Sequence, residues 1–113
     1  MGQRILRVSG LPAAPLDAAA CFHAVWVPQV RALAEQAASG DDLALVFTAG
    51  DHRHQAWRLA AVQELAREAA PARINAVAGD RETSIAVTLA YLAAAPGMTG
   101  QVLAVDGNFV KMD

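Results

Sequence analysis

The sequence has little cysteine and no long apolar run, and both shortages exclude classes of protein. The single cysteine, Cys21, excludes an intramolecular disulfide, a structural zinc site built on cysteines and a secreted disulfide scaffold. No apolar run approaches the ~18–20 residues of a membrane-spanning helix, and the first residues lack the apolar segment of a signal peptide. We therefore expect a cytoplasmic protein without a membrane partner.

Basic charge is also scarce. The net charge is −2 and the isoelectric point is near 5.8, so the chain has no basic stripe for nucleic acid. What the sequence does contain is apolar: 55% of its 113 residues are hydrophobic, and 27 are alanine. This composition excludes intrinsic disorder, and the length fits one domain over residues 1–113.

The apolar pattern predicts strands that alternate with helices. We place strands at residues 3–9, 43–48, 73–79 and 101–106, and helices at residues 18–38, 52–70 and 80–94. The run at 43–48 is apolar throughout, which is typical of a strand covered on both faces. Pro28 predicts a kink near Trp26–Val27 or two abutting helical pieces.

Successive right-handed crossovers between such strands build a parallel sheet. The fold class predicted is α/β, a Rossmann-like half-domain with a four-stranded parallel sheet and three crossover helices. The helices lie on both faces of the sheet, or on one face if every crossover advances in the same direction.

Polar residues mark the predicted helix ends. Asp17 and Asp51 stand where N-caps are expected, and Ser39-Gly40 ends the first helix. The run Asp80-Arg81-Glu82 is typical of capping and of charge matched to a helix dipole. Within the first helix we interpret Cys21 as a buried structural thiol and His23 as an ordinary helix residue.

Three segments of the second half carry a resemblance to a known family. They are Glu64-Leu-Ala-Arg-Glu-Ala-Ala-Pro71, Arg73-Ile-Asn-Ala-Val-Ala-Gly79 and Met98-Thr-Gly-Gln-Val-Leu-Ala-Val-Asp-Gly107. They resemble the classical short-chain dehydrogenase/reductase family. More loosely, Phe22–Pro28 looks like that family's central helix and Asp42–Thr48 like its serine-bearing strand. The resemblance implies a truncated relative that corresponds to the second half of such an enzyme.

The residues that the family uses for hydride transfer are missing from the matching positions. Its Y-x-x-x-K dyad aligns with Asp51 and Gln55, while the only tyrosine is Tyr91 and the only lysine is Lys111. Thr48 is the one hydroxyl near the family's serine, and the glycine-rich cofactor loop has no counterpart. We therefore expect a catalytically inactive relative with no cofactor. Residual NAD(P)-linked oxidoreductase activity is the least favoured alternative.

A candidate site follows the second strand. Ligands of open parallel sheets bind outside the carboxyl ends of the strands, here residues 9–10, 48–51, 78–80 and 106–108. Thr48, Asp51, His52 and His54 cluster at the second end, where a histidine oriented by Asp51 would act as a general base or belong to a metal site. His52 and His54 diverge by about 200° on a helix, so they cannot hold one ion together. The alternative is a capped helix start with solvated polar residues.

The tryptophans point to a partner surface. In the family, the helix at 52–70 and the preceding helix commonly meet their copies across a two-fold axis. The resemblance implies homodimer contacts at Trp26, Trp57, Ala61 and Glu64, and tryptophan is enriched in such surfaces. The alternative is that Trp57 folds back on its own domain.

The first strand, at 3–9, would be a sheet edge without its family neighbour. Gln3, Arg4 and Arg7 would protect this edge with polar side chains, or a partner chain would pair with it. The function predicted is a non-catalytic, oligomerising interaction or regulatory module, bound to its own copy, to a full-length dehydrogenase or to another protein. The alternative is a small-molecule-binding protein or an enzyme of another chemistry, with its site at Thr48–His54.

Overall fold

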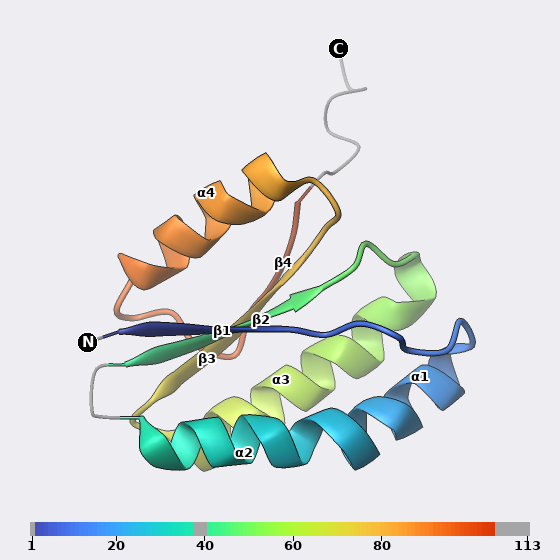
Figure 1. Ribbon diagram of the computed structural model, residues 1–113, viewed down its shortest axis with the longest axis horizontal. Helices are drawn as coiled ribbons and strands as arrows, with labels where there is room; N and C mark the ends of the chain where they lie inside the picture. Colours follow the sequence, from blue (N-terminus) through green and yellow to red (C-terminus); the bar gives the residue numbers. More distant parts are fainter. Residues whose placement is uncertain (1, 38–40, 106–113) are drawn as a thin grey trace.

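The fold is a parallel sheet with helices on both faces (Figure 1), and the computed structural model describes residues 2–37 and 41–105. The strands are β1 (Gln3–Arg7), β2 (Asp42–Phe47), β3 (Arg73–Ala78) and β4 (Val102–Ala104), in the spatial order β1-β2-β3-β4. The helices are α1 (Pro15–Cys21), α2 (Val27–Gln36), α3 (Gln55–Ala69) and α4 (Glu82–Ala93). This confirms the α/β class and the four parallel strands. The strand end predicted at 106–108 and the stop at Ser39-Gly40 lie outside the described residues.

Side chains alternate between two cores along the central strands. Leu43, Leu45 and Phe47 of β2 point toward α2 and α3, whereas Ala44 and Val46 point toward α4. All six residues of β2 are therefore buried, as the unbroken apolar run predicts. Among the described residues, no helix is long and apolar enough to cross a lipid bilayer.

The last crossover has an unexpected hand. Every connection advances in the same direction across the sheet, so uniform right-handed crossovers would place all helices on one face. Instead α4 covers the face opposite to α2 and α3 (Figure 1). The prediction of helices on both faces is confirmed, whereas the single covered face expected when all crossovers advance in one direction is wrong, because the crossover from β3 to β4 has the hand opposite to the first two.

A π-helical turn, η1 (Phe22–Trp26), joins α1 to α2 at the predicted position of the irregularity. The N–H of Val27 donates to the carbonyl oxygen of Phe22, five residues back, and Pro28, which has no N–H, follows in the first turn of α2. The wider turn places both Phe22 and Val27 in the core, while Val25 remains 49% exposed. The irregularity thus changes which apolar residues face inward.

Two of the predicted helix starts need correction. Asp17 is not an N-cap: the cap of α1 is Ala14, and Pro15 occupies the first turn, where its missing N–H costs nothing. Glu82 lies in the first turn of α4, as expected for charge matched to the helix dipole, and the N-cap position is held by Arg81, not by Asp80. Instead the carboxylate of Asp80 accepts a hydrogen bond of 3.0 Å from the N–H of Ala49 and so connects the ends of β2 and β3.

The edge strand β1 is bound to helices on both faces. Both guanidinium end nitrogens of Arg7 donate to the carboxylate of Glu82 on α4, at 3.0 and 2.9 Å, and Arg4 reaches Gln36 on α2 at 3.4 Å. The position of β1 at the edge of the sheet is confirmed. Its charged side chains interact with neighbouring helices, and Ile5 remains about half exposed.

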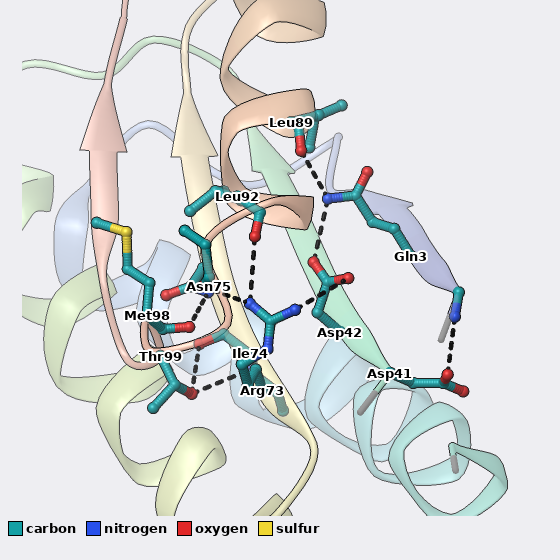
Figure 2. Close-up of polar contacts among 12 residues, drawn as sticks. Gln3, Asp41, Asp42, Arg73, Ile74, Asn75, Leu89, Leu92, Met98 and Thr99 are labelled. Carbon is teal, nitrogen blue, oxygen red and sulfur yellow. Dashed lines mark hydrogen bonds and ion pairs between the residues drawn. The ribbon is translucent and has the colours of Figure 1, made fainter. Parts of the chain in front are cut away.

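A buried polar network fastens the amino ends of the strands to α4 (Figure 2). Asp42 is 3% exposed, and its carboxylate accepts a hydrogen bond of 3.1 Å from the side-chain amide of Gln3. The same carboxylate lies 3.7 Å from the guanidinium of Arg73. Gln3 also donates to the carbonyl oxygen of Leu89 at 2.8 Å. The other end nitrogen of Arg73 donates to the carbonyl oxygen of Leu92 at 3.2 Å. The network therefore links β1, β2 and β3 to the exit of α4.

Asn75 holds the connection between α4 and β4. Its side chain donates a hydrogen bond of 2.9 Å to the carbonyl oxygen of Met98 and accepts one of 3.0 Å from the N–H of Gln101. The hydroxyl oxygen of Thr99 accepts a hydrogen bond of 3.1 Å from the N–H of Ile74. These bonds satisfy polar groups that would otherwise be buried without partners, so Asn75 has a structural role.

Candidate functional site

A pocket of about 320 Å³ opens where β1 and β2 end. Its walls come from the loop after β1, from the residues that follow β2 and from the start of α3. The polar side chains among its lining residues are those of Ser9, Thr48, Asp51, Arg53, His54 and Arg58. The pocket lies at the carboxyl edge of the sheet, where the sequence predicts a site.

His54 faces into this pocket and is buried. Its Nε2 lies 3.1 Å from the carbonyl oxygen of Ala13, and its Nδ1 accepts a hydrogen bond of 3.0 Å from the indole N–H of Trp57. One nitrogen therefore donates while the other accepts, which assigns the neutral ring with its proton on Nε2. Because both nitrogens are engaged, His54 positions the loop after β1 and is not placed as a general base.

Asp51 caps the helical start, as predicted. Its carboxylate accepts 3.0 Å from the N–H of Arg53 and binds the guanidinium of Arg53 at 3.0 and 3.2 Å. The side-chain bonds from Arg53 and then the backbone bond lower the pKa of Asp51 below its ordinary value. Asp51 thus pairs with Arg53 and does not orient a histidine.

His52 begins the 3-10 turn η2 (His52–His54) and is exposed. The capped, solvated helix start therefore describes Asp51, His52 and Arg53, whereas His54 alone turns inward. Across the residues that the structure describes, no three histidine, cysteine, aspartate or glutamate side chains gather as metal ligands would.

Arg58 is the site residue that sequence reasoning missed. It is 7% exposed, and its Nη1 donates 3.1 Å to the carbonyl oxygen of Thr48. Its central carbon lies 4.6 Å from the ring centre of Phe47 and 5.9 Å from that of Trp57. Burial lowers the pKa of Arg58, and the charge of Asp51 opposes this shift.

The guanidinium of Arg58 is closely surrounded but not fully hydrogen-bonded. Its Nε is buried without a hydrogen-bond partner among the described residues. A Cβ added at Gly50 would lie 3.0 Å from Nη2 and 3.1 Å from Nη1, so the guanidinium would have to shift by a few tenths of an ångström. The absence of a side chain at Gly50 therefore allows the backbone to approach the guanidinium of Arg58.

The sequence signal for Arg58 was its place in a buried stripe. The buried residues of α3 are Arg58, Ala61, Val62, Leu65 and Ala66. They follow His54 at helical spacing, so an arginine at position 58 falls on the same face. Leu59, the next residue along the helix, is 38% exposed.

A second hollow, of about 230 Å³, adjoins the first and shares Gly50, Asp51 and Arg58 with it. Gln55 adds an amide to its wall. Its remaining lining side chains are apolar and come from α3, β3 and β4: Leu59, Ala78, Val102 and Ala104. Arg58 therefore separates a polar pocket from a mostly apolar one.

The residues predicted for a dimer contact lie mostly within the chain. Trp57 is half-buried, and its ring centre lies 5.5 Å from that of Phe22. Ala61 is buried in the same core, and Trp26 packs against that core. Glu64 is exposed and pairs with Arg67. Trp57 and Ala61 therefore pack within the chain, with Ala61 5% exposed, and a dimer contact through this face stays a prediction.

Two residues of the first helical segment were also assigned from the sequence. Cys21, the last residue of α1, is half-buried, which corrects the expectation of a buried thiol. His23 is exposed and its Nδ1 bonds the carbonyl oxygen of Ala19 at 2.8 Å, which confirms an ordinary helix residue.

Comparison with known proteins gives one match. A family model described as a short chain dehydrogenase-like protein matches residues 6–105, a range that includes both pockets and all four helices. No curated protein and no solved structure matches the chain.

Proposed function

Because the chain belongs to the short chain dehydrogenase-like family, we propose that it binds a small molecule at the carboxyl edge of its sheet and does not transfer hydride. The observation that carries the proposal is the pocket of about 320 Å³ at the ends of β1 and β2. Such concave sites with a few convergent polar groups are the usual ligand sites of α/β proteins.

The absence of hydride transfer is argued from the residues at the dyad positions. Asp51 stands where the family resemblance places the proton-donating tyrosine, and its carboxylate is occupied by Arg53. The lowered pKa of Asp51 makes it a poor acid at neutral pH. Gln55, at the lysine position, carries no charge. These groups support binding and not proton donation.

The proposal predicts where small molecules bind. We expect a screen of small neutral and charged fragments, monitored by ¹⁵N-resolved NMR, to find saturable changes in the amide chemical shifts of residues 48–54 and 9–13. Shifts confined to the groove between α2 and α3, around Arg31 and Glu68, would contradict the proposed site. Oxidation of NADH or NADPH that depends on Asp51 would contradict the absence of hydride transfer.

A homo-oligomer that pairs through β1 is the second proposal. Trp57 and Ala61 pack within the chain, whereas β1 is a sheet edge with Ile5 half exposed. An exposed edge strand offers a row of N–H and C=O groups to a second copy. This observation favours the strand edge over the helical face for the expected dimer.

Sedimentation velocity at micromolar concentration tests this pairing. We expect a dimer of the 11.8 kDa chain that Ile5→Lys converts to monomer, since a charge opposes edge pairing. Val87→Lys, at an exposed position of α4, should leave the dimer unchanged. A monomer for the unaltered chain would overturn this second proposal.

A further inference from the structure

Arg58 is a buried cation without a counter-ion. Its residue is 7% exposed, and within the described part of the chain it forms no ion pair. Of the five N–H donors of a guanidinium, one is bound to the carbonyl oxygen of Thr48, and Nε has no partner. Removing such a charge from water costs free energy unless an anion or several acceptors replace the water. Because Nε is enclosed, the donors left for a ligand are the remaining N–H groups of the two end nitrogens.

The guanidinium is also held in place before any ligand arrives. Phe47 and Trp57 present their rings to it, which partly offsets the lost hydration. The backbone at Gly50 closes another side. A fixed donor loses little conformational entropy on binding, so it favours an anion of matching shape.

The charge balance around Arg58 indicates a single negative charge. The carboxylate of Asp51 is neutralised by Arg53, and the hydrogen bonds of His54 assign it the neutral form. Arg58 is then the one uncompensated charge among the side chains that line the pocket. A carboxylate matches this charge, whereas a phosphate dianion would add a charge beside Asp51.

The neighbouring hollow gives the ligand its second property. Apart from the three residues it shares with the polar pocket, its wall is Gln55 and four apolar side chains. We propose that the site takes a small monocarboxylate whose acid group binds Arg58 and whose apolar tail enters the hollow lined by Leu59, Ala78, Val102 and Ala104. This inference rests on the proposed small-molecule function.

Benzoate and benzyl alcohol are matched probes, because they share a ring and differ in the acid group. Titration of the full chain, followed by tryptophan fluorescence and by methyl NMR of Val102 and Ala104, should show benzoate binding about tenfold or more tightly, as expected for a charge-assisted bond. Inorganic phosphate should bind more weakly than benzoate. Equal binding of benzoate and benzyl alcohol would overturn the anion site but leave the proposed function standing.

Variants separate the role of Arg58 from general effects of charge. Arg58→Met should abolish the preference for benzoate, and Arg58→Lys should retain part of it, because it keeps the charge without the planar donors. Arg67→Met, which removes an exposed arginine from the same helix, should leave benzoate affinity within about twofold. If Arg58→Met does not fold, Gly50→Ala serves instead: it displaces the guanidinium without removing the charge, and should weaken benzoate more than benzyl alcohol.

The remaining outcomes are also decisive. Preference for phosphate over benzoate would overturn the carboxylate class, and methyl shifts absent from Val102 and Ala104 would overturn the placement of the tail. A preference for benzoate that survives in Arg58→Met would overturn the role of Arg58. If neither probe nor any fragment binds at this edge of the sheet, the proposed function fails together with the inference.

Discussion

Replacement of Arg73 by methionine is expected to lower the free energy of unfolding by about 3–5 kcal/mol, the usual cost of breaking a buried ion pair from one side. Asp42 would lose its cation in a site where its residue is 3% exposed. The carbonyl oxygens of Leu92 and Ala95 would lose a donor at the same time. Urea denaturation measures the change.

Controls distinguish the buried pair from charge in general. Arg67→Met removes an arginine from the exposed pair with Glu64, and we expect a change within about 0.5 kcal/mol. Adding Asp42→Leu to Arg73→Met should recover part of the loss, because the unpaired buried carboxylate is then gone. A loss below about 1 kcal/mol for Arg73→Met would show that the network does not fasten α4.

Phe22→Ala is the second substitution with a large expected effect, a loss of about 3–5 kcal/mol. The ring of Phe22 is fully buried, and its centre lies 5.5 Å from those of both Phe47 and Trp57. Its removal loses the transfer free energy of the ring and leaves a cavity beside Phe47 and Trp57. Thermal or chemical unfolding, monitored by tryptophan fluorescence, gives the value.

Val25→Ala is the matched control, because Val25 belongs to the same π-helical turn but is 49% exposed. It should cost less than about 1 kcal/mol. Similar losses of unfolding free energy for the two substitutions would contradict a turn that buries Phe22 and leaves Val25 exposed. In an α-helix with unbroken spacing, Val25 would be the expected inward neighbour of Phe22.

The positions of the strands followed from sequence because their signals are local. The apolar run 43–48 predicted a strand buried on both faces, and Asp51 was correctly identified as a cap. The hand of the last crossover could not be predicted, since it depends on which face α4 covers. The contacts that α4 makes on that face, such as the hydrogen bond between Gln3 and Leu89, join residues far apart in the sequence and leave no local signal.

The candidate site was predicted in place but not in its chemistry. The sequence indicated the carboxyl end of β2, and His54 does line a pocket there. The sequence pattern did not indicate Arg58, because an arginine on a helix is ordinarily a surface residue. Its side chain is buried by contacts with Phe47, Trp57 and Gly50, which only the folded chain brings together. The segment Arg73–Asn75, part of the family resemblance, proved structural: it anchors α4 and β4.

The separate position of α4 has a consequence for folding during synthesis. β1, β2, β3 and the first three helices are synthesised before α4, so the core beneath α2 and α3 lacks only the contact of Val102 when α4 emerges. Until then Ala44, Val46 and Val77 present an uncovered apolar face. Leu89 of α4 packs over this face of the sheet. Its carbonyl oxygen also accepts the hydrogen bond from Gln3. α4 therefore covers an apolar face of the sheet that the elements synthesised before it leave open.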